Sequence, residues 1–210
     1  DKDNNITEGQ VIARLNGENV MVEADKVNFV DVSPSQIVSV TTSCIPFLDH
    51  DDAKRALMGS NMQRQAVPLL RTEAPIVGTG VEYIAARDSG STIVCKADGV
   101  VEYADSKKII VKNAKGKDEY YLANFERSNA ESNFSHNPIV RAGDKVHRGE
   151  VIADGPSTDK GELALGKNMV IAFMTCNGYN YEDAVVLNEK LVKDDVYTSL
   201  HLSLIHISEP

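Results

Sequence analysis

Cysteine is scarce in this chain, and the cysteines that do occur stand far apart in the sequence. They are Cys44, Cys95 and Cys176, and no two of them form a C-x-x-C unit. Such spacing matches neither a zinc site nor the even-numbered cysteine framework of a small secreted domain. We therefore expect reduced, structural thiols in a cytoplasmic protein.

Several familiar signals are also absent. No stretch stays apolar over the roughly 18 residues that a membrane-spanning helix needs, so we expect no membrane partner. No basic and apolar leader opens the sequence, so we expect no secretion signal. The phosphate-binding loop GxxxxGK[ST], the serine-hydrolase GxSxG and the zinc-protease HExxH do not occur.

The composition is that of a globular protein with an acidic balance. Hydrophobic residues make up 42% and charged residues 25% of the 210 residues, which allows one large domain or two small ones. The formal net charge of −9 argues against a free-standing nucleic-acid-binding protein, because such proteins present a strongly basic face. Any contact with nucleic acid would use a small patch within a larger assembly.

One segment, residues 53–72, runs against this acidic balance. It contains no acid and four cations, which are Lys54, Arg55, Arg64 and Arg71. Carboxamides such as Asn61 and Gln65 lie between them, and guanidinium groups beside carboxamides suit contacts to phosphate and sugar. An amphipathic helix with a solvated basic face explains the segment equally well when it is taken alone.

Local signals predict a hairpin and a helix near the start of the chain. Asn16 and Gly17 separate two apolar runs, which is typical of a two-residue hairpin turn. Ser33 and Pro34 are suited to cap and open a helix that ends before Pro46.

A second helix should begin at Asp52, where neighbouring acids at positions 49 and 51 suit the positive end of the helix dipole. We expect it to break at Gly59, because an interior glycine costs about 1 kcal/mol relative to alanine. On an unbroken helix Arg55 and Asn61 would point in different directions. Asn61 and Gln65 are four apart and could share a face.

The remainder of the chain has the pattern of a β protein. Glycines in residues 76–155 separate short β-type runs, of which the clearest are 92–95, 100–103 and 109–111. Lysines between 107 and 117 indicate a solvated hairpin, and an apolar strand at 169–174 should precede a turn at Asn177 and Gly178. We predict an α+β, predominantly β fold, with small β-barrel or barrel-sandwich-hybrid elements and a few short helices.

Two adjacent acids, Glu182 and Asp183, follow that turn between two tyrosines and an apolar run. Adjacent acids are most often plain surface residues. A carboxylate pair beside a turn is also what a loosely held Mg²⁺ on substrate phosphates would use. Two acids alone make an incomplete metal site.

A rival signal lies at residues 143–160, which resemble the lipoyl and biotinyl carrier domains. In those domains a Gly-Asp turn precedes a hairpin that presents a modifiable lysine, which would be Lys160 here. Gly155 and Pro156 interrupt the strand that should lead to the hairpin tip, since proline cannot donate to a ladder. We favour shared β-barrel architecture over a shared modification, and keep the carrier module as the alternative function.

Taken in order, eight motifs make the chain resemble the β subunit of bacterial DNA-dependent RNA polymerase. They are DVSP (31–34), IPFLDHDD (45–52), RALMG (55–59), NMQRQAVP (61–68), DGPS (154–157), GELALG (161–166), NGYNYED (177–183) and DDVYT (194–198). The resemblance covers about residues 1–201, so we expect an internal fragment of that subunit. It is specific, because several motifs are long and nearly gap-free.

The resemblance implies roles for individual residues in nucleotidyl transfer. Arg55 matches an arginine that contacts the triphosphate of the incoming ribonucleotide. Asn61, Arg64 and Gln65 match a segment near the RNA end and the substrate. The matching acids for positions 182 and 183 lie beside the second, substrate-borne Mg²⁺. The 3′-hydroxyl of RNA attacks the α-phosphate, and pyrophosphate leaves.

The same resemblance implies partners and a division into parts. The partners are the β′, α and σ subunits, the DNA template, RNA and ribonucleoside triphosphates, at the bacterial nucleoid. The principal Mg²⁺ belongs to β′, so this chain alone should be inactive. The predicted divisions are residues 1–30 as the end of an external β-rich lobe, 31–87 as a helical active-site segment, 88–155 as a barrel-sandwich-hybrid-like β domain, 156–201 as the start of the hybrid-binding β-barrel core, and 202–210 as a non-native tail.

Overall fold

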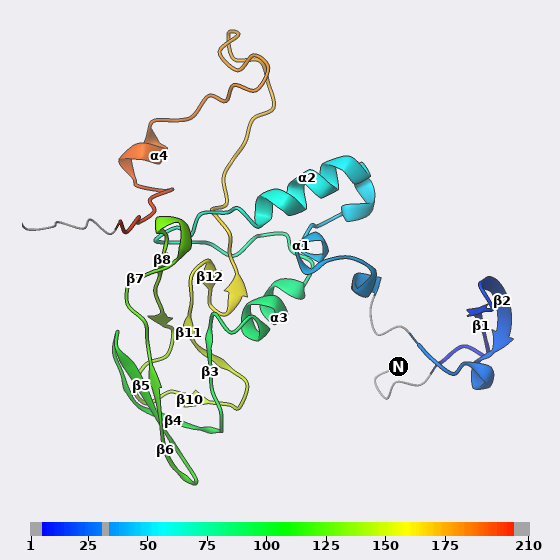
Figure 1. The fold of residues 1–210 in the computed structure, drawn as a ribbon, viewed down its shortest axis with the longest axis horizontal. Helices are drawn as coiled ribbons and strands as arrows, with labels where there is room; N and C mark the ends of the chain where they lie inside the picture. The colour runs from blue at the N-terminus through cyan, green and yellow to red at the C-terminus, as the bar shows by residue number, and fades with distance from the viewer. Residues whose placement is uncertain (1–5, 31–33, 204–210) are drawn as a thin grey trace, which may run out of the picture. The chain divides into compact units, whose positions relative to one another are not determined.

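The computed structural model describes residues 6–30 and 34–203 (Figure 1). Within it the chain divides into two compact units, Asp1–Ser39 and Val40–Pro210, and each is described by itself. Divisions finer than these two units stay a prediction.

The first unit is built on the predicted hairpin. Strands β1 (Gln10–Leu15) and β2 (Glu18–Glu23) pair antiparallel, with Leu15 opposite Glu18 next to the turn. Asn16 and Gly17 both have positive φ, 51° and 92°, as a type I′ turn requires. The hairpin prediction is confirmed. Two short 3-10 helices follow, η1 (Ala24–Lys26) and η2 (Pro34–Ile37).

The predicted single helix after Pro34 is wrong. The 3-10 helix η2 ends at Ile37, and helix α1 (Val40–Ser43) is a separate turn that belongs to the second unit. β-Branched residues dominate this stretch and lose side-chain freedom in a helix, which explains why no continuous helix forms. Ser33, the expected cap, lies outside the described residues.

The second unit combines short helices with several small antiparallel sheets. Its helices are α1, η3 (Leu48–His50), α2 (Ala53–Gln63), α3 (Val81–Asp88), η4 (Asn129–Glu131) and α4 (Lys190–Lys193). Its strands are β3 (Ile93–Val94), β4 (Gly99–Ala104), β5 (Lys108–Asn113), β6 (Gly116–Tyr121), β7 (Glu126–Arg127), β8 (Asn133–Phe134), β9 (Asn137–Pro138), β10 (Lys145–Val146), β11 (Val151–Asp154), β12 (Thr158–Asp159) and β13 (Glu162–Leu163). The strands outnumber the helices, so the predominantly β prediction is confirmed. Among the described residues the sheets do not close into a barrel.

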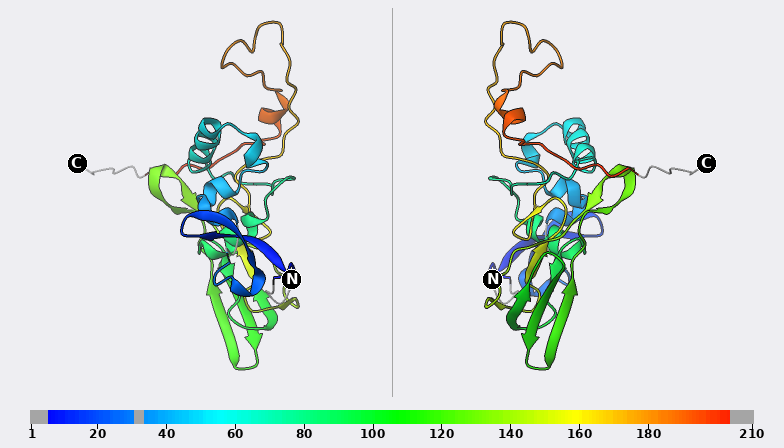
Figure 2. Two further views of the ribbon diagram at one scale, coloured as in Figure 1. Left: turned by 90° about the vertical axis from the view of Figure 1, so that its right-hand side faces the viewer. Right: turned by 90° about the vertical axis from the view of Figure 1, so that its left-hand side faces the viewer.

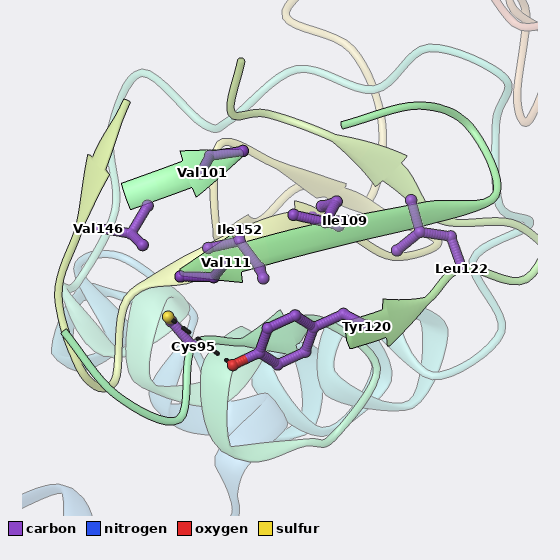
Figure 3. Packing of buried hydrophobic residues seen from close by; sticks show 9 residues of the cluster. Cys95, Val101, Ile109, Val111, Tyr120, Leu122, Val146 and Ile152 are labelled. Atoms are coloured by element: carbon purple, nitrogen blue, oxygen red, sulfur yellow. Dashed lines mark hydrogen bonds between the residues drawn. The ribbon is translucent and has the colours of Figure 1, made fainter. Parts of the chain in front are cut away.

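The core lies between a four-stranded sheet, β10-β4-β5-β6, and a three-stranded sheet, β3-β11-β9. Strand β5 alternates as a half-buried strand should: Ile109 and Val111 are fully buried, while Lys112 points to solvent. Figure 3 shows Ile109 and Val111 in one cluster with Val101, Val146 and Ile152. The predicted lysine-rich solvated hairpin is β5 with β6 and is confirmed.

One polar group is built into this core. The hydroxyl of Tyr120 accepts the backbone N–H of Lys96 at 2.9 Å and donates to Sγ of Cys95 at 3.9 Å (Figure 3). Burial raises the pKa of Tyr120 to about 12, so the hydroxyl stays protonated. All three cysteines are free thiols, as predicted.

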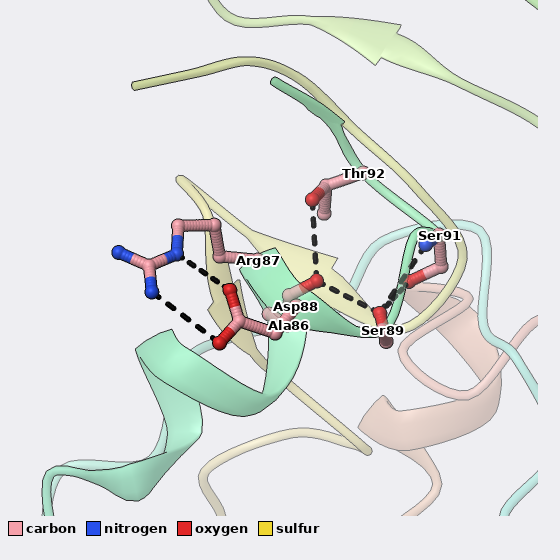
Figure 4. A network of polar contacts seen from close by, with 6 residues as sticks. All are labelled: Ala86, Arg87, Asp88, Ser89, Ser91 and Thr92. Atoms are coloured by element: carbon pink, nitrogen blue, oxygen red, sulfur yellow. Dashed lines mark hydrogen bonds and ion pairs between the residues drawn. The ribbon is translucent and has the colours of Figure 1, made fainter. Parts of the chain in front are cut away.

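The end of α3 is tied to the start of β3 by side-chain hydrogen bonds (Figure 4). The hydroxyls of Ser89 and Thr92 both donate to the carbonyl oxygen of Ala86, at 2.8 Å and 3.2 Å. They satisfy a carbonyl that has no partner within the helix. This junction sets where the chain leaves the helices and enters the sheets.

Residues 167–189 form an open loop without helix or strand (yellow to orange in Figures 1 and 2). The predicted strand at 169–174 is therefore wrong. Val170 is 103% exposed and Phe173 is 96% exposed, so these two apolar side chains pack against nothing in the described chain. A strand requires a neighbour to satisfy its backbone groups, and the described chain offers none here.

Candidate functional site

Helix α2 carries the basic segment and begins where the sequence predicts. Asp52 is its N-cap, and the side chain of Asp52 accepts the backbone N–H of Lys54 at 3.1 Å. The first turn then presents Lys54 and Arg55 and no acid. Cations are disfavoured at this end of a helix, because the backbone N–H groups already make it positive. The two cations of the first turn are flanked by three acids that precede it, Asp49, Asp51 and Asp52.

The predicted break at Gly59 is wrong, since α2 continues through this position to Gln63. A Cβ added at Gly59 would meet no atom within 4 Å, so the glycine is not required for close packing. Its neighbour Ser60 is 5% exposed and donates to the carbonyl oxygen of Leu57 at 3.0 Å. Burial of the helix face that carries Ser60 outweighs the low helix propensity of one glycine.

Continuity of α2 separates the predicted site residues in direction. Arg55 and Asn61 are six residues apart, which turns them about 120° from each other around the helix axis. Gln65 lies beyond the C-cap residue Arg64, so the predicted helical face shared by Asn61 and Gln65 does not form. Instead, the Arg64 guanidinium donates to Oδ1 of Asn61.

The fourth cation of the segment lies apart from α2. Arg71 lines a cavity of about 620 Å³ together with Phe125, His136, Asp154 and Lys167. The sequence analysis assigned no role to this arginine, and α2 does not line the cavity.

The acidic pair lies on a run of tight turns in the open loop. Asn177 and Gly178 have φ of 48° and 78°, and the N–H of Tyr179 donates to the carbonyl of Cys176 at 2.9 Å, which confirms the predicted turn. Glu182 and Asp183 occupy a later turn, in which the N–H of Ala184 donates to the carbonyl oxygen of Tyr181 at 3.2 Å. Both acids are exposed.

The side chain of Asn180 stabilises this loop through two hydrogen bonds to its backbone. No role for this residue was predicted from the sequence. Its Oδ1 accepts the N–H of Cys176 at 2.9 Å, and its Nδ2 donates to the carbonyl of Met174 at 2.6 Å. An asparagine just after an Asn-Gly turn is the only sequence signal for this role.

The described chain does not bring the cation and the acids into contact. Among residues 6–30 and 34–203, no ion pair joins Arg55 to Glu182 or Asp183. No group of three or more His, Cys, Asp or Glu side chains there could hold a metal ion. Two exposed carboxylates suit a Mg²⁺ that substrate phosphates carry, but they do not build a metal site of their own.

Lys160 lies at the tip of the two-stranded hairpin β12–β13 and is exposed. Lys160 and Gly161 both have positive φ, and their backbone N–H groups donate to the buried carboxylate of Asp154 at 2.8 Å and 2.7 Å. Pro156 lies between strands rather than within one. Each strand of the hairpin has two residues, which is much less than the continuous hairpin expected of a carrier.

Comparison with known proteins gives the family. Residues 94–209 match the family model described as RNA polymerase Rpb2, domain 6. The chain belongs to this RNA polymerase family. The match includes the acidic pair of the open loop and extends into residues 202–210, while α2 lies ahead of it.

Curated relatives extend the similarity over nearly the whole chain. The chain is 57% identical to the DNA-directed RNA polymerase subunit beta of Spiroplasma citri over 197 residues, and 56% identical to that of Geobacillus thermodenitrificans over 210 residues. It is 58% identical to that of Caldicellulosiruptor bescii over 203 residues.

These alignments cover 94%, 96% and 96% of this chain, and 15%, 18% and 16% of the relatives. The Rpb2-family chain therefore spans about one sixth of the length of the proteins it matches. Neither the family match nor these relatives support the carrier alternative. None of the helices in the described residues is long and apolar enough to cross a membrane.

Proposed function

We propose that this chain forms part of the nucleotide-addition site of a DNA-directed RNA polymerase, as a piece of its β subunit. The observation that carries the proposal is identity of 56–58% to proteins named as that subunit, over 94–96% of the chain. The reaction is attack of the RNA 3′-hydroxyl on the α-phosphate of a ribonucleoside triphosphate, with release of pyrophosphate. The chain by itself is inactive, because it supplies only some of the groups.

Arg55 binds the triphosphate in this proposal. Its guanidinium makes one weak contact in the described chain, from Nη1 to Sδ of Met58 at 3.9 Å, so almost all of its donors are available. Lys54 is a second cation at the same end of α2. A polyanionic ligand would offset the repulsion that these charges create.

The remaining site residues act around the reacting groups. Asn61 and Gln65 at the C-terminal end of α2 contact the RNA end or the nucleotide, and Arg64 lies against Asn61. Glu182 and Asp183 approach a Mg²⁺ carried by the substrate phosphates, whose chemistry is to neutralise charge on the leaving group. The open loop is held at its start, where Lys167 and Asn168 contact Glu73 and Ala74, but both acids are exposed, so the rest of the polymerase positions them.

Assembly completes both the site and the fold. The partners are the β′, α and σ subunits, the DNA template and the growing RNA, with the principal Mg²⁺ on β′, in the bacterial cytoplasm at the nucleoid. We propose that the small sheets around β4–β6 and β11 complete barrel-sandwich-hybrid elements within the whole subunit. Their short strands and exposed edges support this proposal.

Substitution of Arg55 in the complete polymerase tests the proposal. Arg55→Ala removes one charge-assisted contact worth about 1.5–3 kcal/mol, so kcat/KM for nucleotide addition should fall roughly tenfold or more. Arg55→Lys keeps the charge but not the fork of donors, so its kcat/KM should lie between those of the unsubstituted enzyme and Arg55→Ala. Single-nucleotide extension at limiting and at saturating nucleotide measures kcat/KM and kcat for both variants.

Arg148→Ala is the matched control, because Arg148 is also exposed and makes no side-chain contact in the described chain. It should extend RNA at the normal rate. An unchanged extension rate for Arg55→Ala at limiting nucleotide contradicts the triphosphate role.

A further inference from the structure

We propose that Arg64 is a positioning residue that fixes the orientation of the Asn61 carboxamide, so that its Nδ2 group faces the ligand as a hydrogen-bond donor. The proposal rests on the nucleotide-addition function above and adds the chemical identity of the atom that Asn61 recognises. That atom is a hydrogen-bond acceptor, a phosphate or ribose oxygen of a nucleotide.

The contact that carries the proposal is the hydrogen bond from Nη2 of Arg64 to Oδ1 of Asn61. The two residues are three apart at the end of α2, a spacing that places side chains side by side on a helix surface. A guanidinium has five N–H donors and no acceptor. The carboxamide must therefore turn its oxygen toward Arg64, because the opposite orientation would set N–H against N–H.

Arg64 is itself held at this position by the helix. It is the C-cap residue of α2, with φ of −70° and ψ of −15°, and its backbone N–H donates to the carbonyl of Met62. A cation is favoured here, since the last carbonyl groups of a helix are partly negative. Its charge thus stabilises the helix end while its guanidinium orients the neighbouring side chain.

The consequence lies in the other half of the carboxamide. Asn61 is half-buried, and within the described chain its Nδ2 has no partner. Both N–H donors of Nδ2 are left for a ligand, while Oδ1 is directed toward the Arg64 cation. Gln65 differs, because it lies past the helix end and no side chain in the described part orients it. Gln65 can therefore present either the oxygen or the nitrogen of its amide to a ligand, whereas Asn61 presents its Nδ2.

Substitutions at Asn61 test the identity of the recognised atom in the complete polymerase. Asn61→Asp keeps the shape and the contact to Arg64 but turns an oxygen toward the ligand oxygen. It should lower kcat/KM for nucleotide addition about tenfold further than Asn61→Ala, which only deletes the donors. A rise mainly in KM assigns the acceptor to the incoming nucleotide, and a fall mainly in kcat at saturating nucleotide assigns it to the RNA end.

A double-mutant cycle tests whether Arg64 acts through Asn61. Arg64→Ala should lower kcat/KM in the normal background and have no further effect in the Asn61→Ala background. Arg64→Gln, which can still donate to Oδ1 but carries no charge, should retain more activity than Arg64→Ala. Rescue by a neutral donor separates orientation from simple attraction of the cation to phosphate.

Two results would overturn the inference. One is an Arg64→Ala effect of equal size in both backgrounds, which makes Arg64 an independent contact. The other is Asn61→Asp with activity equal to or above that of Asn61→Ala, which makes the ligand atom a donor. Arg55→Ala in the same assay separates this failure from failure of the proposed function: a defect there with an additive cycle rejects only the inference, and no defect rejects the site itself.

Discussion

The pKa values of two buried acids of the second unit are shifted in opposite directions. Burial alone would raise the pKa of Glu82, but hydrogen bonds from the backbone N–H groups of Thr79 and Gly80 outweigh it and leave this pKa below its usual value. Glu82 thereby caps the start of α3. Burial prevails at Asp154 and raises its pKa, despite donors from Gly161 and Lys160. The balance between desolvation and backbone donors decides the direction at each acid, and the charge of Asp159 adds to the rise at Asp154.

His136 makes a pH-dependent contact. Its Nδ1 accepts the backbone N–H of Ala123 at 3.0 Å, and burial lowers the pKa of the ring below 6.5. The folded state therefore favours the neutral ring. The stabilisation is complete above pH 6.5 and is lost as the pH falls through the lower folded-state pKa, because protonation removes the acceptor.

Hydrogen exchange in the complete polymerase checks this expectation. Protection of the peptide that contains Ala123, corrected for the intrinsic pH dependence of exchange, should fall between pH 7.5 and pH 5. His136→Gln should abolish that dependence, while His147→Gln, an exposed control, should leave it unchanged. Constant corrected protection with His136 intact would refute the account of this contact.

At the scale of elements, α2 shows packing overriding propensity. Its glycine lies in regular helix with open space around the position of a Cβ. We expect Gly59→Ala to stabilise α2 by about 0.5–1 kcal/mol, since alanine loses less backbone entropy on folding. Amide exchange within α2 of the complete polymerase should slow by roughly two- to fivefold.

Gly80→Ala provides the contrast for this prediction. Gly80 begins α3 with φ of +86°, where a side chain is strained, so exchange in α3 should become faster. Faster exchange in α2 of Gly59→Ala would mean that the helix does open at residue 59, as the glycine alone suggests.

The elements that could be predicted from the sequence are those set by neighbouring residues. Asn16 and Gly17 determine their turn through local backbone conformation, and Asp52 determines the start of α2 through its own hydrogen bond. Helix continuity at Gly59 accompanies the burial of its neighbour Ser60, which no local pattern reveals. The Arg64–Asn61 contact could have been predicted from its spacing of three once the helix was known to be unbroken.

At the scale of the whole molecule, the open loop shows how much of the structure depends on the rest of the protein. An apolar segment at 169–174 looks like a strand, yet it has no partner in a chain that spans about one sixth of its relatives. The same dependence applies to the site, because its cation and its acids lie on separate elements with no direct contact among the described residues. The resemblance indicates which residues belong to the proposed site, and in that proposal the assembled polymerase brings them together.

Limited proteolysis tests this dependence. In the isolated chain, chymotrypsin should cut first within residues 167–189, at Phe173, Tyr179 or Tyr181, because these side chains are exposed. In the complete polymerase the same bonds should be protected by surrounding structure. Tyr120 in the core is the internal control and should resist cleavage in both. Equal cleavage of the loop in both samples would show that the rest of the protein does not cover it.

The central claim is that the start of α2 binds the triphosphate of an incoming nucleotide. A nucleoside triphosphate with a photoreactive group on its γ-phosphate, bound to the complete polymerase and irradiated, tests this claim without any substitution. The account predicts crosslinks at residues 53–58, around Arg55, that an unmodified nucleotide removes by competition. Competable crosslinks confined to other segments, with none in α2, would contradict it.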